Sequence, residues 1–267
     1  MSVVDTLRTI PLFSQIRESD LERIAQAARE RTYPKNSVIL FEDDPGDALY
    51  VVVSGQVKVV LSAEDGREVI LSVRAQGDFF GEMSLIDKEP RSAHVIAMED
   101  SKLLVLRRED FQKILVEMPQ IALGLLRAMC TRLRQADDKI GGLVLLDVPG
   151  RVARLLLDMA DENDGAKITK RVTHHMIAQM IGSSRETVSR TMRNMVEQGL
   201  IEASRKLITI ANRNALEVAA GRPPKSAPEK QPSFDGTAER RRTWGGGGPS
   251  PMGTRVSGAA PRPFERR

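Results

Sequence analysis

Four residues between positions 81 and 92 have the types and the spacing needed to hold a phosphorylated sugar. The glycine at position 81 lets backbone amides approach an anion, and the carboxylate of Glu82 can accept a hydrogen bond from a sugar hydroxyl. Arg91 offers a guanidinium group to a phosphate, and the Ser92 hydroxyl lies beside it. If Met83–Asp87 forms a short helix, its first amides point at the same phosphate. The segment therefore predicts a nucleotide site.

A second segment, residues 173–195, has the pattern of two short helices that cross at a tight turn. Its sequence is THHMIAQMIGSSRETVSRTMRNM. The small residue Ala178 allows the helices to touch, and Gly182 tolerates the unusual dihedral angles of a bend. Ser183, followed three residues later by a glutamate, is a capping box, and Ser184 is a second candidate cap. The second helix is therefore expected to start just after these serines, with its charged side chains exposed.

The charged side chains of this second helix can read DNA bases. Arg185 can donate two hydrogen bonds to guanine in the major groove, and Glu186 can accept one from the amino group of cytosine. The alternative is a capped, solvated surface helix. Residues 199–210 then predict a hairpin with a basic turn, which makes the whole unit a winged helix. The predicted DNA contacts are Thr173, His174, Ser184, Arg185, Glu186, Thr187, Ser189, Arg190, Arg193 and Lys206.

The elements that must position these groups change in character along the chain. Over residues 33–106, short β-rich runs alternate with turn residues, which is typical of an antiparallel sandwich or barrel. Ahead of them, residues 18–31 have apolar side chains at helical spacing and predict a packing helix. The predicted strands are residues 37–41, 49–53, 57–61, 69–73, 92–97 and 103–106.

A long helical pattern follows over residues 111–146. Its apolar residues recur at spacings of four and three, a heptad seam held for three heptads. At ~1.5 Å per residue the run spans roughly 50 Å, which is too long for a small sandwich to cover. It therefore favours a parallel homodimer over the alternative, a core helix packed on its own domain. The seam comprises Ala122, Leu126, Met129, Leu133, Ala136, Ile140 and Leu143.

Composition and charge narrow the class of protein. The single cysteine, Cys130, cannot form an intrachain disulfide or an all-cysteine metal site. The first residues lack a charged start followed by an apolar core, and no apolar run reaches the roughly 18 residues of a membrane span, so we expect a cytoplasmic protein. Residues 166–214 carry nine basic against three acidic residues, which would attract a phosphate backbone. Residues 219–267, rich in proline and glycine, are expected to be a disordered basic tail.

Together these motifs resemble the cyclic AMP receptor protein family of bacterial transcription regulators, the CRP/FNR superfamily. The string FGEMSLIDKEPRSA is similar to its phosphate-binding cassette, GRVARLLLDMA to its linker helix, and IGSSRETVSRTMRNMVEQGLI to its helix-turn-helix. The resemblance implies an α+β fold. A cyclic-nucleotide-binding β-roll, jelly-roll-like, would occupy residues 1–110, a dimerisation helix 111–147, and a winged helix-turn-helix 148–218.

The resemblance also implies how such a protein works. A ligand, cyclic AMP first of all, binds the β-roll, repositions the long helices of a homodimer and so moves its DNA-reading heads. Contact with RNA polymerase is expected as well. Glu82 would hold the ribose hydroxyl, and Arg91 with Ser92 the cyclic phosphate. The implied ligand site comprises Gly81, Glu82, Met83, Ser84, Arg91, Ser92, Ala93, Ala136 and Asp137.

Two positions depart from the family pattern. Where the cyclic AMP receptor presents adjacent Thr and Ser to adenine, this chain has Ala136 and Asp137. A carboxylate is suited to accept from the two donors on the Watson–Crick edge of guanine. Cyclic GMP or cyclic di-GMP, the latter used by some members of the superfamily, is therefore an alternative effector. The other interpretation is that Asp137 simply faces water.

Other chemistries find less support in the sequence. Cys130 alone cannot ligate the iron–sulfur cluster of the oxygen-sensing branch. His94 lies near the cassette, but a single strand histidine is more often packed or exposed than bound to heme. His174 and His175 point about 100° apart on a helix, which does not suit a shared metal ion. No catalytic constellation calls for an enzyme, and the alternatives are a nucleotide-sensing regulatory subunit of an enzyme or a DNA-binding protein without effector control.

Overall fold

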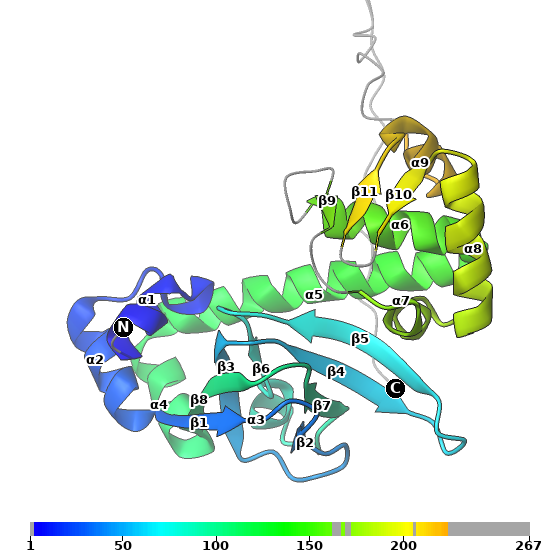
Figure 1. Ribbon diagram of the computed structural model, residues 1–267. Helices are drawn as coiled ribbons and strands as arrows, with labels where there is room; N and C mark the ends of the chain where they lie inside the picture. Colours follow the sequence, from blue (N-terminus) through cyan, green and yellow to red (C-terminus); the bar gives the residue numbers. More distant parts are fainter. Residues whose placement is uncertain (1–2, 162–166, 169–171, 205–206, 224–267) are drawn as a thin grey trace, which may run out of the picture. The chain divides into compact units, whose positions relative to one another are not determined.

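The computed structural model describes residues 3–161, 167–168, 172–204 and 207–223 (Figure 1). All of these residues belong to one unit of the chain, which is bounded by residues 1 and 227. Most of the expected tail, 219–267, therefore lies outside the described residues. The same is true of the basic turn residues Arg205 and Lys206.

Two antiparallel four-stranded sheets form the N-terminal sandwich (Figure 1). Aliphatic and β-branched side chains dominate the strands, and Val52, Val57 and Leu103 are fully buried in one core drawn from both sheets. This arrangement confirms the expected antiparallel sandwich. In order, one sheet holds β1 (Arg29–Tyr33), β8 (Ser101–Arg107), β3 (Ala48–Ser54) and β6 (Phe79–Phe80), and the other holds β2 (Val38–Leu40), β7 (His94–Ala97), β4 (Val57–Ser62) and β5 (Glu68–Arg74).

Short helices share a second core with the first sheet. The buried side chains Phe13, Leu49 and Phe111 belong to this core, which joins the N-terminal helices to β3 and β8. The elements that contribute are α1 (Val3–Thr9), the 3₁₀ turn Pro11–Phe13, α2 (Glu18–Ala27) and α4 (Arg108–Glu117).

The predicted helix over residues 18–31 is too long. α2 ends at Ala27, Ala28 is extended (φ −81°, ψ 143°), and β1 begins at Arg29, which pairs with Val105 of β8. β1 lies at the edge of its sheet, and most of its side chains are exposed. An exposed edge strand carries no apolar alternation, so its sequence gives no period of two to detect.

The prediction of one continuous helix over residues 111–146 is also wrong, because the helix is interrupted at Met118. Proline lacks an amide hydrogen and disfavours helical dihedral angles in the residue before it. Accordingly Met118 has φ −129° and ψ 74°, α4 ends before it, and α5 (Pro119–Leu145) begins after it with a bend of 107°. The 27 residues of α5 span about 40 Å.

None of the described helices taken singly is long and apolar enough to cross a membrane. By length and composition α4 and α5 pass that test only as a pair, across their 107° bend.

The C-terminal half is a mostly helical unit with its own core. α6 (Val148–Asp161) holds Pro149 in its first turn, and its buried face packs with α7 (His174–Ile181), α8 (Arg185–Glu197) and α9 (Arg213–Ala219). A small sheet has the order β10 (Ile201–Ala203), β11 (Ile208–Ile210) and β9 (Lys167–Ile168). The predicted hairpin after the second helix is therefore confirmed, with β9 as an additional third strand.

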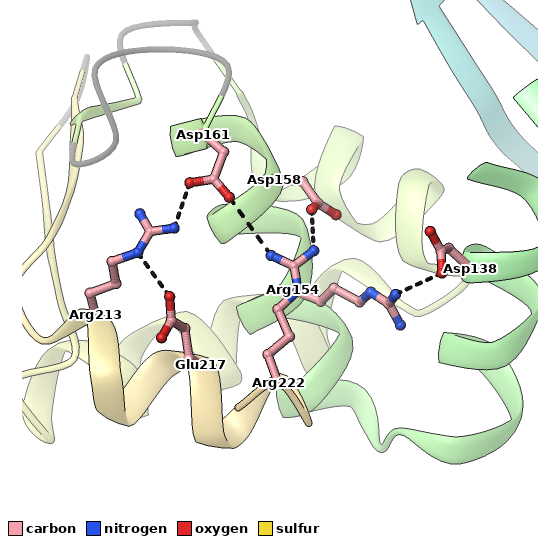
Figure 2. Close-up of polar contacts among 7 residues, drawn as sticks. All are labelled: Asp138, Arg154, Asp158, Asp161, Arg213, Glu217 and Arg222. Atoms are coloured by element: carbon pink, nitrogen blue, oxygen red, sulfur yellow. Dashed lines mark hydrogen bonds and ion pairs between the residues drawn. The ribbon is translucent and has the colours of Figure 1, made fainter. Parts of the chain in front are cut away.

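Ion pairs fasten α9 and the residues after it to α6 (Figure 2). Arg213 lies 2.5 Å from the carboxylate of Asp161 and 2.9 Å from that of Glu217, which is buried. Arg222 lies 2.5 Å from Asp158. These contacts hold the last described turn of the chain against the helix that leads into the C-terminal unit.

Candidate functional site

Arg91 lies buried at the centre of the predicted ligand segment, with only 3% of its surface exposed. Its guanidinium group donates to the carbonyl of Gly81 at 2.7 Å and to that of Ala48 at 2.9 Å. Gly81 has a φ of +81°, and a Cβ atom there would lie 2.8 Å from Nη1 of Arg91. A glycine is therefore needed both for the backbone conformation and for the close approach of the arginine.

Burial lowers the pKa of Arg91, while the nearby Tyr50 and Asp47 act in the opposite direction. The carboxylate of Asp47 is 3.6 Å from Nη2. Within the described part of the chain the buried Nε atom of Arg91 has no hydrogen-bond partner. Two carbonyls thus fix the orientation of the side chain, and the Nε–H donor is left for another group.

Glu82 is also 3% exposed, and its two carboxylate oxygens differ. Oε1 accepts a hydrogen bond from Arg132 of α5 at 2.7 Å, whereas the buried Oε2 has no partner among the described residues. Arg132 also donates to the carbonyl of Phe79 at 2.6 Å and stacks over that ring, 4.4 Å from its centroid. α5 therefore contributes a charged group directly to the site.

Sequence reasoning missed Arg132. It lies one helical turn before Ala136, so the two positions share a face of α5. That spacing was the available signal, because Ala136 already belonged to the predicted ligand site.

The other predicted ligand residues fall into two groups. Ser84 and Ala93 are buried, and the Ser84 carbonyl accepts a hydrogen bond from Arg108 at 3.1 Å. Met83 begins the short α3 (Met83–Asp87), which confirms the expected helix. The remaining side chains, Met83, Ser92, Ala136 and Asp137, are exposed. The structure therefore brings Gly81, Glu82, Ser84 and Arg91 together around one buried cluster.

The second candidate site is the exposed face of α8. Val188, Met192 and Met195 recur at helical spacing and are buried in the C-terminal core, which turns the opposite face outward. An open hollow on that face is lined by Arg185, Glu186, Ser189, Arg190 and Arg193. All five are predicted DNA contacts.

The turn that precedes α8 follows the expected chemistry with one correction. Gly182 has a φ of +63° and ends α7, as predicted for the bend. The cap of α8 is Ser184, whose hydroxyl accepts from the Thr187 amide at 3.1 Å, and not Ser183. α8 begins at Arg185, one residue too late for a box between Ser183 and Glu186.

Two of the predicted DNA contacts, Thr173 and Ser184, also cap the N-termini of helices. The hydroxyl of Thr173 accepts from the Met176 amide at 3.1 Å and caps α7, while the exposed His174 is the first residue of that helix. The hydroxyls of Ser184 and Thr187 lie 2.9 Å apart. Lys206, the remaining predicted contact, lies outside the described residues.

The predicted dimer seam is largely uncovered on α5. Leu133 is 64% exposed and Ile140 is 59% exposed, and Leu126 and Leu143 are more than half exposed as well. Met129, by contrast, is partly buried against the N-terminal core. A long helix with a row of exposed leucines presents an apolar surface that favours association.

The side chains considered as metal or heme ligands have other surroundings. The Nδ1 atom of His94 accepts from the amide of Glu42 at 3.1 Å, and its ring meets Phe41 edge to face. Cys130 is exposed on α5. Among the described residues, no three or more histidine, cysteine and acidic side chains are grouped so that they could hold a metal ion.

Two family models match the chain at these two sites. The cyclic nucleotide-binding domain matches residues 30–117, which include Glu82 and Arg91. The Crp-like helix-turn-helix domain matches residues 150–219, which include α7 and α8.

Relatives and solved structures match both regions together. The CRP-like cAMP-activated global transcriptional regulator of Mycobacterium tuberculosis is 30% identical over 210 residues, which cover 77% of this chain and 94% of the relative. The cyclic AMP receptor protein of Thermus thermophilus is 33% identical over 210 residues, covering 79% and 96%. The c-di-GMP responsive global regulator CLP of Xanthomonas campestris aligns with a TM-score of 0.64 at 26% identity, covering 73% of this chain and 99% of that chain.

Proposed function

Because the chain belongs to the cyclic AMP receptor protein family (CRP/FNR) of DNA-binding transcription regulators, we propose that a cyclic nucleotide bound between Glu82 and Arg91 controls how α8 reads DNA. The family accounts for the two sites in one chain. The ligand, the homodimer and the individual contacts are the parts that we propose.

Two buried polar atoms carry this proposal. Among the described residues, Oε2 of Glu82 lacks a donor and Nε of Arg91 lacks an acceptor. A buried polar atom without a partner costs about 1–3 kcal/mol, so a group that supplies the missing hydrogen bonds binds favourably there. The ribose hydroxyl of a cyclic nucleotide is a donor for Glu82, and its phosphate is an acceptor for Arg91. Ser92 is a further candidate for the phosphate.

Cyclic AMP is the first candidate effector, since relatives that match nearly their whole length are named for it. A guanine nucleotide is the second candidate. It is favoured by Asp137, whose exposed carboxylate follows Ala136 on α5 and is free to accept from the guanine edge.

The contact between Glu82 and Arg132 offers a route from ligand to helix. A ribose hydroxyl that donates to Glu82 alters the strength of the 2.7 Å ion pair between Glu82 and Arg132. It therefore alters the position of α5 against the sandwich. A ligand shifts such an equilibrium only by its differential affinity for the two arrangements. Arg132 is the charged group through which that difference would reach α5.

We further propose a parallel homodimer through the seam of α5. Two copies of α8 would then read half-sites about one helical turn, ~34 Å, apart, so the operator is expected to be pseudo-palindromic. As a regulator of chromosomal genes the protein would act in the bacterial cytoplasm, and the family resemblance adds RNA polymerase as a partner.

The test of effector control uses the full chain stripped of nucleotide. Cyclic AMP, cyclic GMP and cyclic di-GMP are titrated in a calorimeter, and operator sequences are selected from random duplexes with and without each nucleotide. We expect one nucleotide to bind and to raise operator affinity at least about tenfold, the size of a typical allosteric coupling.

Two results would contradict this. Operator affinity that no nucleotide changes would leave a DNA-binding protein without effector control. If no sequence were enriched although a nucleotide binds, the chain would be a sensor that regulates another protein.

The dimer has its own test in analytical ultracentrifugation. Leu133→Glu places a charge in the proposed seam and is expected to yield monomers that bind operator at least about tenfold more weakly, because both half-sites no longer bind together. Val116→Glu, at a position 81% exposed on α4, is the matched control and is expected to remain dimeric. Dimers of the Leu133 variant would rule out this seam.

A further inference from the structure

The proposed dimer seam of α5 has two flanks, which the heptad pattern defines. The seam residues occupy positions a and d, with Leu126, Leu133 and Ile140 at a. Position g comes directly before each of these residues, and position e comes directly after each d residue. The flanking residues are Leu125, Arg132 and Lys139 at g, and Cys130, Asp137 and Val144 at e.

The residues of the g flank are held by the sandwich of their own chain. Leu125 is 5% exposed and belongs to the N-terminal core. Arg132 donates to the carboxylate of Glu82. The ammonium group of Lys139 donates to the carbonyl of Leu71 at 2.6 Å. This flank therefore lies against the β-sheets, beside the proposed nucleotide site.

The residues of the e flank are uncovered. Cys130 and Asp137 are exposed, and Val144 is 75% exposed. No described residue forms a hydrogen bond or an ion pair with the carboxylate of Asp137. The next residue, Asp138, differs in this respect, because its carboxylate lies 3.3 Å from Arg154 of α6. Asp137 is thus a free charge at the edge of an apolar row.

A parallel, in-register dimer brings a g flank and an e flank together. In such a dimer the g residue of one heptad meets the e residue of the next heptad in the other helix, and opposite charges at these positions form ion pairs. Arg132 and Asp137 have this spacing, so Asp137 of the partner subunit meets Arg132. Along α5, the whole of which is described, the other facing pairs are Leu125 with Cys130 and Lys139 with Val144. Neither of these joins opposite charges.

Arg132 has donors left for a second carboxylate. Its Nη1 donates to Glu82 at 2.7 Å and its Nη2 to the carbonyl of Phe79 at 2.6 Å, which uses two of the five N–H donors of a guanidinium group. The side chain of Arg132 is 19% exposed, so part of it is open beyond the sandwich. A second carboxylate can therefore add a charge-assisted hydrogen bond without displacing Glu82.

We propose that Asp137 of the partner subunit pairs with Arg132, so that each nucleotide site of the homodimer is bordered by carboxylates from both subunits. This inference rests on the proposed homodimer, and it gives Asp137 a role other than binding a guanine base. Glu82 and the partner's Asp137 then share one guanidinium group. Because the ribose hydroxyl is proposed to bind Glu82, nucleotide binding and dimerisation are linked through Arg132, and such linkage is reciprocal.

The experiment measures the dimer dissociation constant of the full chain, stripped of nucleotide, by analytical ultracentrifugation. Asp137→Asn is expected to weaken the dimer at least about threefold, because a homodimer loses two symmetry-related ion pairs at once. Asp137→Glu keeps the charge and is expected to retain most of the affinity. Asp138→Asn is the matched control. Its carboxylate pairs with Arg154 of its own chain, so this variant should change the dissociation constant less than about twofold.

A double-mutant cycle then identifies the partner of Asp137. Once Arg132→Gln has removed the guanidinium group, Asp137→Asn is expected to have no further effect, because residues in contact give non-additive losses. Thermal unfolding of each variant establishes that it is folded. The linkage predicts in addition that a bound nucleotide shifts the dimer dissociation constant of wild type more than that of Asp137→Asn.

The outcomes separate the ion pair from the proposals on which it rests. Losses that add in the double variant, or a dimer that Asp137→Asn leaves unchanged, would overturn the pair and keep the homodimer. A stronger dimer in Asp137→Asn would also overturn it, since the two copies of Asp137 would then repel each other. Wild type that stays monomeric would overturn the homodimer and the pair together. The cycle needs no nucleotide, so it tests the pair even if effector control fails.

Discussion

Arginine occupies two different environments in this chain. In the proposed nucleotide site Arg91 is 3% exposed and already bonded to the carbonyls of Gly81 and Ala48. On α8, Arg185 and Arg190 are exposed and form no ion pair with any described residue. The same side chain is thus held in position by the protein at one site and left to water at the other.

The difference determines how each site is expected to bind. A buried, oriented guanidinium group loses little entropy when it binds a phosphate, so the proposed nucleotide site is suited to a small ligand bound with defined geometry. Exposed arginines that neutralise a DNA phosphate backbone release its counterions, so DNA binding through α8 is expected to fall steeply with salt. Ligand affinity and DNA affinity should therefore respond differently to ionic strength.

The largest expected effect comes from breaking the buried site. Arg91→Ala removes the charge proposed to meet the ligand phosphate and is expected to weaken nucleotide binding by about 2–5 kcal/mol, measured by calorimetry, since the phosphate would lose its charged partner. Arg29→Ala, on the exposed edge strand β1, serves as the control and should change nothing. If the Arg91 variant unfolds at a lower temperature but keeps its affinity for nucleotide, its role is structural.

A smaller and more selective effect is expected at the exposed site. Arg185→Ala should cost about 1–3 kcal/mol on the operator and relax the requirement at one base pair, because a bidentate base contact is lost. The measurement is competition binding against operators substituted at each position. Asn194→Ala, also exposed on α8, should leave the preference intact. A uniform loss across all operators would assign Arg185 to the phosphate backbone.

The smallest expected effect lies at a contact between β5 of the sandwich and α7 of the C-terminal unit. Glu68 of β5 accepts from Lys58 and from Gln179 of α7, each at 2.9 Å, and the hydrogen bond from Lys58 is the main reason that the pKa of Glu68 is lowered. A lowered folded-state pKa stabilises the protein above the unfolded value, about 4.3, and this stabilisation is lost as the pH falls through the folded value.

Unfolding by urea at pH 7 and at pH 3 measures this contribution. Because solvent screens this partly exposed pair, Glu68→Gln should cost less than about 1 kcal/mol at pH 7 and less still at pH 3, below the unfolded pKa. Equal cost at both pH values would mean that the carboxylate charge does not matter. Glu64→Gln, an exposed carboxylate between the same strands, is the control.

Much of the fold could be predicted because its signals are local. The sandwich strands carry apolar runs punctuated by turn residues, and the bend between α7 and α8 needs a residue such as Gly182 that adopts a positive φ. The first turn of α8 follows from a serine cap, although the choice between Ser183 and Ser184 depends on where helical dihedral angles begin. Propensity and capping are properties of neighbouring residues, so the sequence contains them.

The failures have different causes. Pro119 is a local signal for a helix break, but the apolar spacing continues across it and so predicted one helix. In the structure the proline separates α4 from α5. β1 gives no signal because its side chains are exposed. Arg132 was missed although its spacing of one turn from Ala136 was a signal, and its bonds to Glu82 and Phe79 arise only when α5 meets the end of β6.

Arg91 and Arg132 are held by groups of different kinds, and these groups differ in whether a mutation can remove them. The acceptors of Arg91 are main-chain carbonyls, and an exchange of side chain at Ala48 does not delete a carbonyl. Arg132, in contrast, depends on the side chain of Glu82, which a single codon change can abolish. The orientation of Arg91 is therefore robust to substitution of its neighbours, while that of Arg132 depends on one carboxylate side chain. If the proposed nucleotide site is correct, new effectors are most readily acquired by substitutions around Glu82 and Arg132, with Arg91 unchanged.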